Sequence, residues 1–167
     1  MMNQCIQTIT NIFSTRGYTI NQQEFDKIIG LKSDGEIICV FFVLNSKFNM
    51  ELIQNYLIMM SELTCNHAII VFKDSITPTA KKITENIKFK IELFHFDELQ
   101  LDITHHRLVP KHEKLSIEES AFFKKQYGLK HPVLLKSDPI ARYYGYERND
   151  VIKITRKNGY VAFRIVK

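Results

Sequence analysis

Residues 37–44 are Ile-Ile-Cys-Val-Phe-Phe-Val-Leu, and this run decides the fold of the first half of the chain. It is short, almost wholly apolar and rich in β-branched and aromatic residues, which is typical of a strand buried on both faces. A second such run covers 68–72 and a third strand is predicted at 90–94. Between the first two strands, residues 49–63 have apolar positions at helical spacing. Strands that alternate with helices predict an α/β layer.

The segments around this layer contain residues that typically begin or end helices. Apolar residues at helical spacing predict a helix over 3–16 that ends at Gly17. Asn21 suits the N-cap of a second, short helix that runs through Ile29 and ends at Gly30, and 33–35 predicts a turn. Thr77-Pro78 predicts the start of a further helix, because a proline at the first helical position loses no hydrogen bond.

The character of the chain changes near residue 103. Residues 1–102 hold 9 lysines and arginines against 12 acidic residues, a net charge of −3. Residues 103–167 hold 14 against 6, a net charge of +8. We therefore expect two domains, 1–102 and 103–167, of which the second suits acidic protein surfaces or nucleic acid.

The basic second part also contains clear end signals. Ser116 predicts the start of a helix that ends at Gly128, and Asp138-Pro139 the start of a short helix that ends at Gly145. We expect residues 105–110 to be extended ahead of Pro110. Two strands, 150–156 and 160–167, are predicted around a tight Asn158-Gly159 turn.

The sequence contains no motif of a catalytic site that we can identify. Nucleotide-binding, hydrolase and zinc-protease motifs are absent. His105, His106 and His112 lack the ligand spacing of a zinc site, so we expect no metal and no cofactor. A metal-dependent nuclease would need acidic ligands on its central strands, and 37–44 and 68–72 carry none. The three widely spaced cysteines predict buried thiols, and no stretch is long enough to span a bilayer.

Nucleic-acid binding stays open as an alternative. Four tyrosines of the second part, at positions 143, 144, 146 and 160, are interleaved with arginines and lysines that could neutralise phosphate. The same alternation is expected of strands that pack one face inward and expose their charges. A free-standing basic nucleic-acid-binding protein is therefore the second hypothesis.

Four ordered segments of the second part resemble a known family. They are His106-Arg107-Leu108-Val109-Pro110-Lys111-His112, 138–145 (Asp-Pro-Ile-Ala-Arg-Tyr-Tyr-Gly), 148–156 (Arg-Asn-Asp-Val-Ile-Lys-Ile-Thr-Arg) and 160–164 (Tyr-Val-Ala-Phe-Arg). They are similar to the fifth subunit shared by the eukaryotic nuclear DNA-dependent RNA polymerases, whose C-terminal part corresponds to a small subunit of the archaeal RNA polymerases. Residues 16–18 and 76–81 resemble the same eukaryotic subunit more weakly. A shortened 30–36 region suits a version from a large DNA virus, and Asn149 stands where the family has glycine.

The resemblance implies an α/β (α+β overall) fold with two parts. The first is a nuclease-like jaw domain without catalytic residues, which has a small mixed sheet flanked by helices. The second is an assembly domain, a small mixed sheet with two helices. The resemblance also implies a non-enzymatic subunit that docks on the largest polymerase subunit, contacts other subunits and supports downstream duplex DNA, with no membrane partner and no small-molecule substrate. We expect it in the nucleus if cellular, and in a cytoplasmic viral factory or virion if viral.

The residues expected to serve these roles follow from the matching segments. The partner-binding candidates are His106, Pro110, His112, Asp138, Pro139, Arg142, Tyr143, Gly145, Arg148, Lys153, Arg156 and Arg164. The candidates for contacts between the jaw and downstream DNA are Arg16, Thr77 and Lys81.

Overall fold

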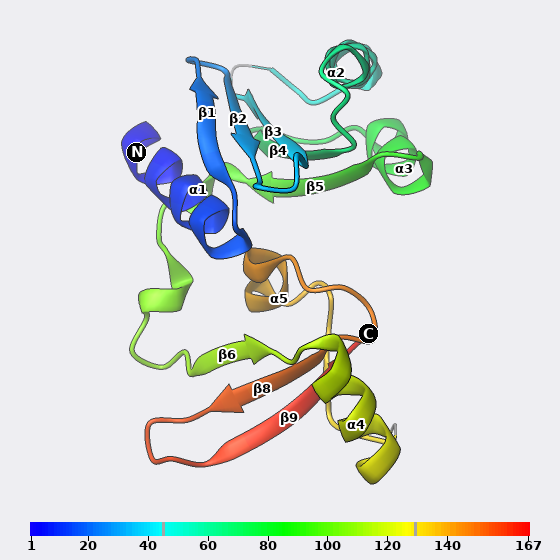
Figure 1. Ribbon diagram of the computed structural model, residues 1–167. Helices are drawn as coiled ribbons and strands as arrows, with labels where there is room; N and C mark the ends of the chain where they lie inside the picture. Colours follow the sequence, from blue (N-terminus) through cyan, green and yellow to red (C-terminus); the bar gives the residue numbers. More distant parts are fainter. Residues whose placement is uncertain (45, 129) are drawn as a thin grey trace. The chain divides into compact units, whose positions relative to one another are not determined.

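The computed structural model describes residues 1–44, 46–128 and 130–167 (Figure 1). The chain divides into two compact units, Met1–Leu101 and Asp102–Lys167. Each unit combines one mixed sheet with helices, which confirms the predicted α/β (α+β overall) class.

The N-terminal unit is built on a five-stranded sheet whose strands lie in chain order. Its elements are α1 (Met2–Arg16), β1 (Thr19–Gln23), β2 (Lys27–Leu31), β3 (Ile37–Val43), α2 (Met50–Glu62), β4 (His67–Phe72), α3 (Pro78–Asn86), β5 (Lys90–His95) and the 3₁₀ helix η1 (Phe96–Leu99). The first three strands pair antiparallel, whereas β3, β4 and β5 run parallel. Parallel neighbours need a crossover, and α2 and α3 provide the two crossovers.

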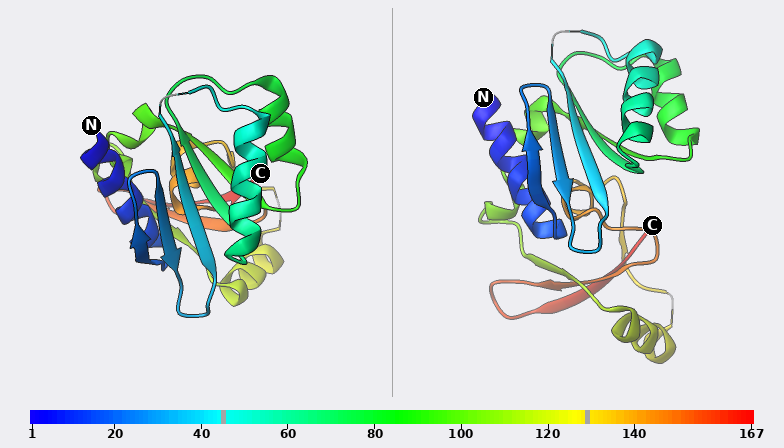
Figure 2. Two further views of the ribbon diagram at one scale, coloured as in Figure 1. Left: turned by 90° about the horizontal axis from the view of Figure 1, so that it is seen from above. Right: turned by 45° about the horizontal axis from the view of Figure 1, so that its top comes forward.

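Helices cover both faces of this sheet, with α1 on one face and α2 and α3 on the other (Figures 1 and 2). Strand β3 therefore buries side chains on both sides, as its unbroken apolar run predicts. Cys39 and Phe41 belong to the core under α2 and α3. Ile38 lies on the opposite face of the sheet, where it borders Gly30 of β2 together with Phe13 of α1.

The predicted helix over residues 21–29 is wrong, because this segment forms the β1–β2 hairpin. Thr19 pairs with Leu31 and Ile20 with Gly30. Ile28 and Ile29 are both buried, which a strand between two helical layers allows. Gly30 does not end a helix; a Cβ there would lie 2.5 Å from Cε2 of Phe13, so only glycine fits without displacement.

In the N-terminal unit, the predicted end of the first helix and the predicted start of the third are confirmed. Gly17 ends α1 in the left-handed conformation with φ 82°. The side chain of Thr77 accepts a hydrogen bond from the backbone N–H of Ala80, and Pro78 occupies the first turn of α3. Cys5, Cys39 and Cys65 are buried free thiols, as predicted.

The C-terminal unit is built on a four-stranded sheet of order β6-β8-β9-β7. Its elements are the 3₁₀ helix η2 (Ile103–His105), β6 (Lys111–Lys114), α4 (Ile117–Tyr127), β7 (Val133–Leu134), α5 (Pro139–Tyr144), β8 (Val151–Thr155) and β9 (Val161–Val166). β8 pairs antiparallel with β6 and β9, and β7 pairs parallel with β9. Alternate residues of β8 therefore enter two different cores.

One core packs α5 and the other α4 against this sheet. Ala141 of α5 lies with Ile152 and Ile154 of β8. Phe123 of α4 lies with Val151 and with Ile165 of β9. A capping box between Ser116 and Glu119 begins α4, so both helices start where the sequence predicts.

Two local predictions for this unit need correction. Residues 103–105 form η2 and 107–108 form a turn, so 105–110 is not a continuous extended segment. Residues 157–159 join the two strands, as predicted, but only Gly159 of the Asn158-Gly159 pair is left-handed (φ 80°), so the turn fits a type I turn with a following bulge rather than a tight two-residue turn. Asn149 does adopt the left-handed conformation that its side chain tolerates, with φ 72°.

Candidate partner interface

A groove in the C-terminal unit is lined by residues of the first family-like segment and of the β8–β9 turn. It encloses about 340 Å³ between Arg107, Leu108, Val109, Pro110, Arg156 and Lys157. We call it the basic groove. Lys111 of β6 pairs with Thr155 of β8 at the end of these strands. Pro110, just before Lys111, and Arg156, just after Thr155, therefore lie side by side. The predicted candidates Pro110 and Arg156 both line this groove.

His106 and His112 flank the groove-lining segment in different environments. His106 is exposed, and its Nδ1 accepts a hydrogen bond from the backbone N–H of Leu108 at 3.3 Å. His112 is half-buried in β6, with Nδ1 2.8 Å from the carbonyl oxygen of Pro110. Burial lowers the pKa of His112 and so disfavours its charged form.

Four predicted candidates shape α5 and do not present reactive groups to a partner. The Asp138 side chain caps Ile140 N–H at 2.9 Å, and Pro139 fills the first turn. Gly145 ends the helix in the left-handed conformation, with φ 68°. Tyr143 is buried, and its hydroxyl donates to Oδ2 of Asp102 at 2.9 Å. Tyr143 thus serves the fold through this hydrogen bond, and its role in partner binding stays a prediction.

The remaining basic candidates lie at several places on the unit. Arg142 is half-buried in the last turn of α5. Lys153 lies opposite Glu113 of β6, and its charge helps to lower the pKa of that carboxyl after the larger effect of Lys111. Arg164 donates to the carbonyl of Val133 at 3.3 Å.

Arg148 belongs to a second hollow, beside α4. Its apolar lining includes Ile117, which is 90% exposed. Lys124 donates to the carbonyl of Asn149 at 2.7 Å across this hollow. Of the twelve predicted partner-binding residues, Arg148 and Arg156 are thus exposed cations that line concave surfaces.

The three residues of the N-terminal unit that are expected to contact DNA lie in different environments. Arg16 forms a two-pronged ion pair with Glu92, at 2.7 Å and 2.9 Å, and its side chain is only 6% exposed. The guanidinium of Arg16 is thus held by Glu92, and its contact with DNA stays a prediction. Thr77 serves as the N-cap of α3, and Lys81 is exposed on that helix.

The Arg16–Glu92 pair is part of a network that sequence reasoning did not find. His67 of β4 also binds the Glu92 carboxylate. Burial raises the pKa of Glu92, but hydrogen bonds from His67 and Arg16 outweigh it and lower the pKa to about 2. The network links α1, β4 and β5. Arg16 and Glu92 are 76 residues apart, so no local sequence pattern predicts their pairing.

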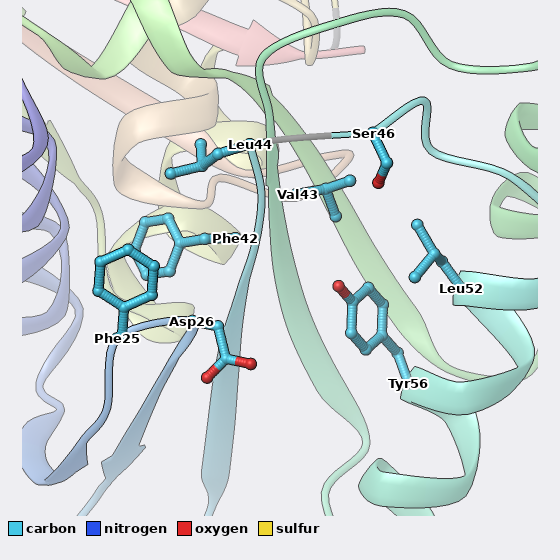
Figure 3. A pocket seen from close by; sticks show the side chains of 8 residues that line it. All are labelled: Phe25, Asp26, Phe42, Val43, Leu44, Ser46, Leu52 and Tyr56. Atoms are coloured by element: carbon cyan, nitrogen blue, oxygen red, sulfur yellow. The ribbon is translucent and has the colours of Figure 1, made fainter.

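An apolar hollow of about 240 Å³ in the N-terminal unit was also not predicted (Figure 3). It lies between the β1–β2 turn, the end of β3 and α2. Its lining residues are Phe25, Asp26, Phe42, Val43, Leu44, Ser46, Leu52 and Tyr56. Phe25 is 81% exposed, whereas Tyr56 stacks on Phe41 with ring centroids 4.3 Å apart.

Within residues 1–44, 46–128 and 130–167, no helix has the length and apolar character to cross a membrane. The same residues contain no group of three or more His, Cys, Asp and Glu side chains arranged to hold a metal ion.

Comparisons with known proteins match both units. The family model of the RNA polymerase Rpb5 C-terminal domain matches residues 101–166. The chain is 34% identical to "Putative DNA-directed RNA polymerase subunit 454R" of Invertebrate iridescent virus 6, over 100% of both chains. It is 33% identical to "DNA-directed RNA polymerases I, II, and III subunit rpabc1" of Dictyostelium discoideum, over 97% of this chain and 95% of the relative. The RPABC1 subunit of Caenorhabditis elegans is 30% identical, over 96% and 92%. These matches confirm the resemblance that the four C-terminal segments predict.

Proposed function

Because the chain belongs to the Rpb5 family of DNA-directed RNA polymerase subunits, we propose that it is a structural subunit of such an enzyme. Its C-terminal unit docks on the largest subunit, and its N-terminal unit supports downstream duplex DNA. The observation that carries this proposal is the extent of the similarity, which covers both units in the viral and the cellular relatives.

The division of labour among the family-like residues supports docking through the C-terminal unit. Residues such as Asp138, Gly145 and Tyr143 fix the fold through caps and a buried hydrogen bond. His106, Arg148 and Arg156 are exposed. These exposed residues are the ones that a partner can contact. The family-like segments therefore supply contact residues as well as residues that fix the fold.

The N-terminal unit is proposed to contribute no active site. The parallel strands β3 and β4 carry no acidic residue, so they offer no carboxylate to a divalent ion of the nuclease kind. Glu92 of β5 is held by Arg16 and His67. The supporting role toward DNA is assigned to the surface around the start of α3, where Lys81 is exposed.

Affinity purification of the tagged full-length chain, co-expressed with the other subunits of its polymerase, tests the proposal. We expect the largest subunit to be recovered with the chain and to remain after nuclease treatment. Recovery of the chain without any polymerase subunit would refute the proposal. Recovery of nucleic acid alone, with binding that falls steeply as salt rises, would favour the free-standing nucleic-acid-binding protein instead.

Imaging of the same tagged chain tests the expected location. A cellular chain should concentrate in the nucleus. A viral chain should concentrate in cytoplasmic viral factories or be packaged in virions. Even distribution through the cytoplasm of uninfected cells, with no polymerase partner, would contradict both.

A further inference from the structure

We infer that the basic groove receives an acidic protein segment of the largest polymerase subunit, an inference that rests on the proposed function. An aliphatic side chain of that segment packs on residues 108–110. Its carboxylates face Arg107, Arg156 and Lys157.

The charges of the groove are the first reason. Arg107, Arg156 and Lys157 line one hollow, and no acidic side chain lines it with them. Among the described residues, no ion pair joins any of these three cations to a carboxylate. Three cations that share a hollow repel one another, and an acidic occupant removes that repulsion.

Neighbouring lysines of the same sheet behave differently. In β6, Lys111 pairs with Glu113 at 2.7 Å and Lys114 pairs with Asp150 at 2.9 Å. The unit therefore neutralises these two lysines within its own surface, whereas the described residues place no carboxylate against the three groove cations. This contrast favours a carboxylate supplied by a partner.

The second reason is the apolar wall of the groove. Leu108 is 76% exposed, beside Val109 and Pro110. The backbone around it is fixed, because the N–H of Val109 donates to the carbonyl of His106 at 2.9 Å. The exposed leucine is thus held out by an ordered turn, and burial of such a side chain favours binding.

The composition of the groove favours protein over nucleic acid. Single strands bind by stacking bases on aromatic rings, and no aromatic residue lines the groove. The nearby ring of Tyr160 already faces the guanidinium of Arg156, whose central carbon lies 5.9 Å from the ring centroid. A segment that carries both acidic and aliphatic residues matches the two walls together.

The test uses the full-length chain in the co-expressed polymerase. Arg156→Glu with Lys157→Glu should lower recovery of the largest subunit at least about tenfold, because like charges then face the acidic segment. Lys88→Glu with Lys125→Glu, which changes two other exposed lysines and the net charge equally, should leave recovery unchanged. Leu108→Ser should lower recovery roughly tenfold, whereas Leu135→Ser, at another exposed leucine, should not.

A carbodiimide cross-linker, which joins an amine directly to a carboxylate, identifies the occupant. We expect Lys157 to be joined to an Asp or Glu of the largest polymerase subunit. Normal recovery with the Arg156 and Lys157 double variant, or no cross-link at Lys157 in an assembled enzyme, would overturn the groove and leave the proposed function intact. Loss of wild-type recovery after nuclease treatment would overturn the groove in favour of nucleic acid. Failure of wild-type recovery under every condition would instead refute the proposed function itself.

Discussion

Replacement of Glu92 by glutamine should destabilise the N-terminal unit by roughly 3 kcal/mol at pH 7. The pKa of this carboxyl falls from an ordinary value of 4.5 to about 2 in the folded chain. Each unit of that difference corresponds to about 1.4 kcal/mol of stability for the ionised form. Arg16, whose side chain is 6% exposed, would also be left buried without its counter-charge, and breaking such a pair costs about 3–5 kcal/mol.

Urea unfolding followed by circular dichroism measures this loss. Glu85→Gln removes an exposed carboxylate from α3 and serves as the matched control, with an expected change within about 0.5 kcal/mol. A double variant, Arg16→Met with Glu92→Met, should lose less than the two single changes added together, because it leaves no unpaired charge. Equal stability of Glu92→Gln and Glu85→Gln would refute the reasoning.

The pH dependence provides an independent check of the same network. A carboxyl whose pKa is lowered by folding stabilises the fold above its unfolded pKa, and this contribution disappears as pH falls through the folded value. The difference between wild type and Glu92→Gln should therefore be complete above about pH 5 and shrink steadily toward pH 2. A difference that stays constant across this range would show that the carboxylate charge is not the cause.

Three further substitutions test the packing and the backbone. Gly30→Ala should cost about 1–3 kcal/mol in thermal unfolding, because its Cβ would lie 2.5 Å from a ring carbon of buried Phe13; a neutral result would disprove that close approach. Gly145→Val should cost roughly 1–3 kcal/mol, because φ is 68° there, and an unchanged melting temperature would refute that conformation. Tyr143→Phe should cost about 1 kcal/mol by urea unfolding, since it removes the hydrogen bond to Asp102, and full stability would show that this bond contributes nothing.

The sequence predicts the parts of the fold whose signals are local. The apolar run of β3 could only be a strand with both faces covered, and helices do cover both faces. Thr77-Pro78 and Asp138-Pro139 begin helices, because a side-chain cap followed by proline depends on adjacent residues alone. Such signals act over three or four residues and do not need the rest of the chain.

The failures have long-range causes. Residues 21–29 have helical spacing at Phe25, Ile28 and Ile29, yet Ile28 and Ile29 pair with β3 on one side and with β1 on the other. The role of Gly30 depends on Phe13, a residue of a different layer. The ion pair of Arg16 could not be predicted, because its partner, Glu92, lies 76 positions away. Tertiary contacts decide in each of these cases, and one sequence does not reveal them.

The candidate interface was predicted in part. The resemblance selected Pro110 and Arg156, which line one groove, but could not separate these surface residues from Asp138 and Gly145, which shape a helix. Caps and exposed contacts give similar residue patterns, because both use polar residues and glycine in loops. Only the burial and hydrogen bonding of each side chain distinguish them.

The two strand orders have a consequence for synthesis on the ribosome. In the N-terminal unit the strands are laid down in chain order, so its sheet can be complete once residue 95 has emerged. In the C-terminal unit β9 lies between β8 and β7, so its sheet stays open until Val161–Val166 are available. During translation, the N-terminal unit can thus reach its native form while the C-terminal unit still awaits β9, an interior strand of its sheet.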